Sequence, residues 1–155
     1  MEDLEALKSR VYSISDIEAQ LILLRLGRVT ATVKAHIRNA REWARLLAPM
    51  GDAAPHLLPA EDNVFTKMLV WFPGPHGEER KRMFRRALWR SGVETESSYV
   101  PLHTRPAFSH FPRSSMPFAD EQWRGALSLP ARPSLGPQDW GRIEHAIECL
   151  IRGRV

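Results

Sequence analysis

One stretch of this 155-residue chain gathers most of the side chains that could bind a ligand. Interleaved with its prolines it carries Tyr99, His103, Thr104, Arg105, His110 and Arg113. Prolines restrict the conformations of a loop, and an arginine binds a phosphate or a carboxylate through two parallel hydrogen bonds. This composition is typical of a loop that holds an anionic or sugar ligand. The alternative is a structured loop whose tyrosine and histidine satisfy backbone groups, and the residues by themselves leave both interpretations open.

Outside this stretch the sequence contains no local catalytic signature. It has no glycine-rich phosphate loop, no H-E-x-x-H and no G-x-S-x-G. The six histidines are scattered without the spacing of metal ligands, and the single cysteine, Cys149, cannot form a disulfide within the chain. We therefore expect no catalytic residue and no metal site on this chain, and the role of Cys149 stays open.

The composition excludes several classes of protein. With 43% hydrophobic and 26% charged residues the chain is globular, and no apolar run is long enough to cross a membrane. The acidic start at Glu2, Asp3 and Glu5 argues against a secretory signal, so we expect a cytoplasmic protein. The net charge of +4 comes mainly from arginine. The arginines of 80–90 fall on the outer face of a predicted helix, where they are usually just solvated, so we expect no nucleic-acid partner.

The elements that position the candidate loop begin with a long helix. Ser15 followed by Glu18 forms a capping box, the signature of a helix start. Apolar residues then recur every three or four positions: Ile17, Leu21, Leu24, Leu26, Val29, Val33, Ile37, Ala40, Ala44 and Leu47. This pattern predicts a helix of roughly thirty residues, bent at Gly27 and ending before Pro49 and Gly51. A helix of that length is expected to run along or between bodies.

The remainder alternates short strands and helices. Residues 49–62 read as a loop, 97–117 as an irregular stretch, and strands are predicted at 64–72, 93–96 and 126–129. Helices are predicted at 76–90, 116–123 and 137–152. The inner face of the first should carry Met83, Phe84, Ala87 and Leu88, and that of the last Trp140, Ile143, Ile147, Leu150 and Ile151. The sequence thus predicts an α/β fold of the α+β kind, a long N-terminal helix followed by a short, mostly antiparallel sheet covered by helices.

Five collinear segments resemble a known family. They are Ser15–Leu21 (SDIEAQL), Ile37–Ala40 (IRNA), Gly92–Thr95 (GVET), the pair Tyr99–His103 (YVPLH) and Arg105–Phe108 (RPAF), and Leu127–Pro130 (LSLP). Together they resemble the C-terminal part of the DegT/StrS-type pyridoxal-phosphate sugar aminotransferases, which have the fold type I of aspartate aminotransferase. The resemblance extends from about residue 10 to about residue 152.

The resemblance implies a division of the chain and an absent part. Residues 1–48 would be an N-terminal segment with the linking helix, and residues 49–155 the small C-terminal domain. The family's large domain, which supplies the Schiff-base lysine and most of the phosphate cup, would be absent from this chain. None of its lysines (Lys8, Lys34, Lys67, Lys81) lies in a context like that of the family's lysine. Pyridoxal phosphate is therefore expected on a partner chain and not covalently on this one.

Two departures from the family's pattern bear on the site. Before the helix, the family's asparagine and arginine are replaced by Val11 and Ser13, so we expect no cofactor-binding residue here. In the second departure, Arg105 stands where the family has a glutamine. Tyr99 and His103 keep their places on a loop that approaches the substrate in the family. The resemblance thus implies substrate binding by Tyr99, His103 and Arg105.

Two functional hypotheses follow. The first is a small-domain subunit of a divided aminotransferase, which docks on a large-domain polypeptide and shares a site for an amino donor and a keto sugar or cyclitol. The second is a non-catalytic accessory or regulatory protein that binds an aminotransferase. The retained Tyr99 and His103 favour the first, whereas Val11 and Ser13 favour the second.

Overall fold

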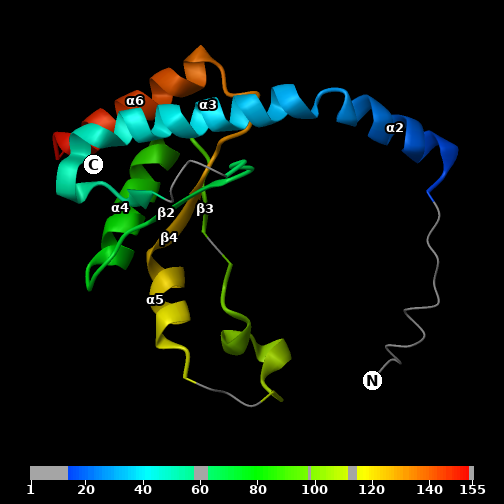
Figure 1. The fold of residues 1–155 in the computed structure, drawn as a ribbon. Helices are drawn as coiled ribbons and strands as arrows, with labels where there is room; N and C mark the ends of the chain where they lie inside the picture. Colours follow the sequence, from blue (N-terminus) through cyan, green and yellow to red (C-terminus); the bar gives the residue numbers. More distant parts are fainter. Residues whose placement is uncertain (1–13, 58–62, 98, 112–114, 154–155) are drawn as a thin grey trace. The chain divides into compact units, whose positions relative to one another are not determined.

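The computed structural model describes residues 14–57, 63–97, 99–111 and 115–153 (Figure 1). The chain divides into two compact units, the first ending at Thr32 and the second beginning at Val33. The second contains a four-stranded antiparallel sheet with helices against it, so the predicted fold class is confirmed. Within the described ranges, no helix is both long enough and apolar enough to cross a membrane.

The first helix begins where the capping box predicts. In α2 (Asp16–Leu26) the Ser15 hydroxyl accepts a hydrogen bond from the Glu18 amide at 3.3 Å, and the Glu18 carboxylate accepts one from the Ser15 amide at 2.8 Å. The Ser15 hydroxyl also donates to this carboxylate at 2.8 Å, and the bonds from the Ser15 amide and hydroxyl lower the pKa of Glu18 below its ordinary value. A helix start can thus be located from four residues of sequence.

The prediction of one continuous helix is wrong at its middle. α2 ends at Leu26, and α3 (Val29–Leu47) begins after a two-residue turn, whereas we predicted only a bend at Gly27. At the turn the Arg28 amide donates to the Arg25 carbonyl, three residues back, which is tighter than α-helical pairing. Glycine is a poor helix former, and this weakens the junction further.

The sheet has the strand order β1-β2-β4-β3, with every pairing antiparallel. The strands are β1 (His56–Leu57), β2 (Met68–Trp71), β3 (Glu96–Ser97) and β4 (Ala126–Leu129). The β4 prediction is confirmed to the residue. β2 is shorter than the predicted 64–72, β3 lies later than the predicted 93–96, and β1 falls inside the predicted loop 49–62, after the 3₁₀ helix η1 (Ala48–Ala53).

The hydrophobic core is formed by the sheet together with two helices and the second part of α3. α4 (Gly77–Arg90) and α6 (Pro137–Ile151) pack against each other, as the sequence predicts to within a residue or two. The most deeply buried apolar side chains are Trp43, Leu47, Val70, Phe84, Leu88, Leu127, Leu129 and Ile143. Two predicted core positions are wrong, because Met83 and Ile151 are each 49% exposed. Met83 lies about 100° around α4 from Phe84, and Ile151 is the last residue of α6.

Specific hydrogen bonds fix α3 to the chain just after β4. The side-chain amide of Asn39, almost fully buried, donates to the carbonyls of Ala131 at 3.3 Å and Arg132 at 2.7 Å. The Trp43 indole donates to the Pro130 carbonyl at 2.7 Å. α3 is therefore anchored at the end of the sheet where β4 finishes.

The opposite end of β4 adjoins α5 (Pro117–Gly125), which leads directly into it (Figure 1). Gly125 and Gly77 both lie against the Phe72 carbonyl, where an added Cβ would come within 2.5 Å and 2.1 Å of its oxygen. Only glycine permits the end of α5 and the start of α4 to approach this carbonyl so closely. This packing fixes the base on which the candidate loop rests.

Candidate functional site

The candidate loop is described over residues 99–111 and contains two short 3₁₀ helices, η2 (Leu102–Thr104) and η3 (Pro106–Phe108). Its backbone is held by local hydrogen bonds, from the Thr104 amide to the Pro101 carbonyl and from the Phe108 amide to the Arg105 carbonyl, each 3.0 Å. The Thr104 hydroxyl also donates to the Pro101 carbonyl at 2.7 Å. The segment is thus an ordered support for its polar side chains. Arg113, which we grouped with them, lies outside the described residues.

His103 joins this segment to α5. Its Nε2 lies 3.1 Å from Oδ1 of Asp120, and both side chains are partly buried, 20% and 30% exposed. A carboxylate accepts hydrogen bonds, so the neutral imidazole that makes this contact carries its proton on Nε2. Nδ1 then remains a hydrogen-bond acceptor. Asp120 therefore fixes both the position and the tautomer of His103.

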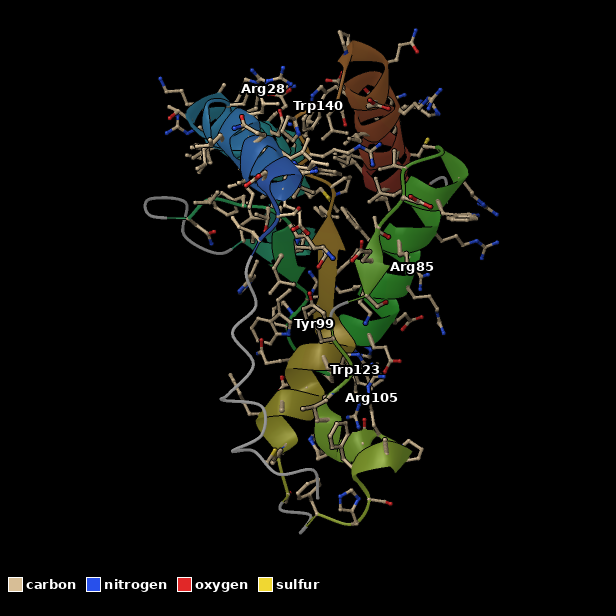
Figure 2. All side chains as sticks on the ribbon, turned by 90° about the vertical axis from the view of Figure 1, so that its right-hand side faces the viewer. Arg28, Arg85, Tyr99, Arg105, Trp123 and Trp140 are labelled. Carbon is tan, nitrogen blue, oxygen red and sulfur yellow. The ribbon has the colours of Figure 1, made fainter. Side chains whose placement is uncertain are left out.

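Tyr99 and Arg105 lie on the same segment but point into open space. The Tyr99 residue is 87% exposed and Arg105 is also exposed. In Figure 2 Tyr99 lies nearest the sheet, and Arg105 lies further along, near the level of Trp123 on α5. In the described part of the chain, no hydrogen bond joins Tyr99, His103 and Arg105 to one another. The structure presents them from one segment without closing them into a pocket.

Close to Tyr99, an ion pair crosses from the chain before β2 to β3. The Lys67 ammonium donates to the Glu96 carboxylate, and this hydrogen bond raises the pKa of Lys67 above its ordinary value. The Glu96 charge adds to the effect, and so does Tyr99, more weakly. The ammonium of Lys67 is therefore engaged and stays protonated at neutral pH.

The sequence did not reveal Asp120 as part of this arrangement. It is 17 residues from His103, on a different element, and no spacing rule links the two positions. An acidic residue in the first turn of a helix is an ordinary helix-stabilising feature. Only the folded structure shows that this carboxylate faces the imidazole.

An imidazole held by a carboxylate, a phenol and a guanidinium can bind hydroxyl, phosphate or carboxylate groups. None of the three is a nucleophile activated by a neighbouring base, because the only oriented pair is a histidine with its own carboxylate. The arrangement is suited to binding and positioning a polar, anionic ligand.

Of the three described lysines, Lys34 is exposed on α3, and Lys67 and Lys81 are engaged in hydrogen bonds. Lys67 is paired with Glu96, and the Lys81 ammonium donates to the Trp123 carbonyl at 3.2 Å. Burial lowers the pKa of Lys81, but its side chain lies between α4 and α5 and none of the cavities described for the chain is lined by it. We therefore derive no cofactor chemistry from the residues present.

Comparison with known proteins identifies the family. The sequence model of the DegT/DnrJ/EryC1/StrS aminotransferase family matches residues 7–148, which is most of the chain. The chain therefore belongs to this family, whose enzymes depend on pyridoxal phosphate. The resemblance of the five sequence segments is thereby confirmed. Comparison with the curated proteins gives no significant match.

Solved aminotransferase structures share the fold of this chain. PseC of Helicobacter pylori, an aminotransferase involved in the biosynthesis of pseudoaminic acid, superposes with a TM-score of 0.71 at 15% identity, over 93% of this chain and 41% of PseC. DesV of S. venezuelae, solved in complex with a ketimine intermediate, gives 0.70 at 24% identity, over 92% and 40%. A DegT DnrJ EryC1 StrS aminotransferase from Brucella abortus gives 0.65 at 20% identity, over 83% and 33%. This chain therefore spans between 33% and 41% of the length of these proteins.

Proposed function

We propose that this chain is the small-domain subunit of a divided pyridoxal-phosphate-dependent sugar or cyclitol aminotransferase. In this proposal residues 1–48 are the linking segment and 49–155 the small domain. A second polypeptide supplies the large domain with the cofactor. The complex acts in the cytoplasm on an amino donor and a keto sugar or cyclitol, and this chain contributes binding residues but no covalent chemistry.

The observation that carries the proposal is the exposure of α2. Among its described residues none is buried, although the helix is rich in leucine and isoleucine. From Ile14 to Val29, eight large apolar side chains are between 45% and 75% exposed: Ile14, Ile17, Leu21, Ile22, Leu23, Leu24, Leu26 and Val29. Proteins rarely leave so continuous an apolar surface in water, and such surfaces mark interaction sites.

The distribution of these side chains indicates how α2 is covered. At about 100° per residue, Ile17, Leu21 and Leu24 fall on one side of the helix and Ile22, Leu23 and Leu26 on the opposite side. Polar residues separate the two stripes: Asp16, Glu18, Gln20 and Arg25. A helix with apolar residues on opposite sides is normally enclosed. We therefore propose that the partner's large domain surrounds α2 on both sides.

The candidate loop is the part of this chain that we expect to bind the substrate in the complex. Tyr99 and Arg105 are exposed and His103 is partly buried beside Asp120, which suits one wall of a site whose other wall belongs to the large domain. Arg105 supplies a fixed positive charge for an anionic group of the substrate. His103 offers its Nδ1 to a hydroxyl, while Asp120 holds the ring in place.

The first test is assembly. Coexpression with a polypeptide that carries the family's large domain should give a stable complex in size-exclusion chromatography with light scattering, burying about 1,200 Å² or more. The double variants Leu21→Gln/Leu24→Gln and Ile22→Gln/Leu26→Gln should each weaken it. Met83→Gln, an exposed apolar residue of α4, is the matched control and should not. A monomer of this chain with every large-domain candidate would remove the support for a divided enzyme.

The second test separates a subunit from an accessory protein. In the assembled complex, Arg105→Ala should lower kcat/KM roughly ten- to a hundredfold through loss of a charge-assisted contact, and His103→Ala should lower it by up to about tenfold through loss of a neutral hydrogen bond. Arg86→Ala, on the exposed face of α4, is the control. If both loop variants assemble and react at the wild-type rate, the chain is an accessory protein.

The location of the cofactor is tested on the chain alone. Pyridoxal phosphate titrated against the purified chain, followed by borohydride reduction and mass spectrometry, should give no stoichiometric adduct at a single lysine. The same treatment of the complex should label a lysine of the large-domain polypeptide. A specific adduct on this chain, with turnover, would contradict the proposed division of labour.

A further inference from the structure

A groove whose lining includes several polar side chains lies between α4 and α6 and shares no residue with the 99–111 segment. Its volume is about 540 Å³, in the range of small-molecule sites. α6 contributes Gln138, Arg142, His145 and Cys149, which follow one another at three- or four-residue spacing and therefore share one side of the helix. The end of α4 contributes Arg90 and Ser91.

Small residues form the floor of this groove, and polar side chains stand at its rim. Ala87 of α4 and Ala146 of α6 are buried at the bottom, and Gly141 has open space where a side chain would stand. Small residues in these positions keep the two helices from filling the space between them. The groove thus results from the packing of two well-defined helices.

The charged side chains that line the groove are positive. Arg90 and Arg142 come from opposite walls, and no carboxylate is among the residues that line it. The acidic residues of α6 are engaged elsewhere: Glu144 lies 3.9 Å from Arg45, Glu148 lies 3.5 Å from Arg152, and Asp139 accepts a hydrogen bond from the Gly136 amide. Neither Arg90 nor Arg142 has an ion-pair partner among the residues the structure describes.

We propose that this groove binds a small molecule that carries phosphate or carboxylate groups. Two guanidinium groups facing one space from opposite walls match an anion with several acceptor oxygens, since each presents several N–H donors in a planar fork. The Ser91 hydroxyl and the Gln138 amide can add hydrogen bonds to the same ligand. Binding here requires neither the large-domain partner nor pyridoxal phosphate, so the proposal stands or falls independently of the proposed function.

The groove contains its own reporter. Cys149 is the only cysteine of the sequence, and its Sγ lies 3.7 Å from His145 Nε2 in the groove wall. The thiol is partly exposed, so a reagent in solution can reach it. Because labelling can occur at one position only, its rate measures access to this groove.

The experiment measures the rate at which an uncharged pyridyl disulfide labels Cys149, at constant ionic strength, with increasing inorganic pyrophosphate or citrate. The two anions distinguish a phosphate site from a carboxylate site. We expect at least one of them to protect the thiol saturably. Arg142→Gln and Arg90→Gln should each raise the concentration needed for half-protection by roughly tenfold or more, because each removes a charge-assisted contact.

Arg86→Gln is the matched control, because it makes the same change of charge on α4 outside the groove. In this variant the anion should protect Cys149 at the same concentration as in the wild type. Circular dichroism verifies that each variant is folded, and two arginines on different helices keep the test decisive if one variant fails. Absence of saturable protection with both anions would overturn the proposal. An equal effect of Arg86→Gln would also overturn it, because it would show a response to net charge alone.

Discussion

α2 and the second part of α3 both carry large apolar residues, on two opposite sides of α2 and on one side of α3, and the two helices have opposite environments. In α3 the pattern is buried, with Trp43 and Leu47 at most 1% exposed. In α2 the pattern is open, with Ile17 at 75% and Leu24 at 66% exposed. Apolar residues at helical spacing mark the positions that are buried in the assembly in which a protein works. A single chain of that assembly buries only some of these positions by itself. In the proposed complex, this difference identifies α2 as the surface that the large-domain partner covers.

The largest expected effect concerns the buried helix. Trp43→Ala removes a fully buried indole and its hydrogen bond to Pro130, and should lower the free energy of unfolding by about 3–5 kcal/mol. Urea unfolding followed by circular dichroism measures this. Trp89→Ala, at a tryptophan that is 69% exposed, should change the stability far less. Similar losses of stability for the two variants would contradict the assignment of Trp43 to the core and of Trp89 to the surface.

A smaller loss is expected where α3 is fixed by polar contacts. Asn39→Ala leaves the carbonyls of Ala131 and Arg132 without their donor and should cost about 1–3 kcal/mol in the same assay. Lys34→Ala, at an exposed position of α3, serves as the control. If Asn39→Ala is as stable as Lys34→Ala, these hydrogen bonds do not anchor the helix.

On the exposed helix the same type of measurement should show almost no change. Leu24→Gln in the isolated chain should alter the free energy of unfolding by no more than about 0.5 kcal/mol, because the side chain is already in water. Its effect should appear only in the affinity for the large-domain partner. A core-sized loss of stability in the isolated chain would show that α2 is covered by the chain itself.

The smallest effect is a dependence of α2 on pH. Glu18 has a lowered pKa in the folded helix, so its contribution is present above the ordinary carboxyl value of 4.5 and is lost as the pH falls through the lowered one. The NMR shifts of residues 16–19 should therefore report fraying of the helix start as the pH falls below 4.5 and through the lowered pKa of Glu18. Glu18→Gln, which removes the titrating carboxylate, should abolish this dependence. The same titration in both proteins would show that the capping box does not act.

Local signals predicted much of this fold. The capping box at Ser15 predicted a helix start that the structure reproduces, because it depends on neighbouring residues, and the predicted strand 126–129 is reproduced as well. The face of α4 was predicted correctly for Phe84, Ala87 and Leu88, whereas Met83 lies beyond its edge. The two-residue strand β1 is too short to carry a pattern, and it exists only because β2 lies beside it.

The candidate site was predictable in part. The sequence points to the loop, and the structure shows that Tyr99 and Arg105 are exposed. The contact of His103 with Asp120 depends on how α5 is placed at the end of β4, which no local pattern encodes. In the proposed complex the site is formed by two polypeptides. The sequence of this chain alone predicts such a site less well, because the other polypeptide supplies the remaining residues.

Hydrogen exchange across the 14–26 segment tests the central claim most directly. Peptides from this segment, followed by mass spectrometry, should exchange rapidly in the isolated chain, because none of the residues of α2 is buried. Addition of the large-domain partner should slow their exchange by roughly tenfold or more, while peptides from the buried part of α3 change little. Strong protection of α2 in the isolated chain, or unchanged exchange in a complex that demonstrably forms, would contradict its assignment as the helix that the partner encloses.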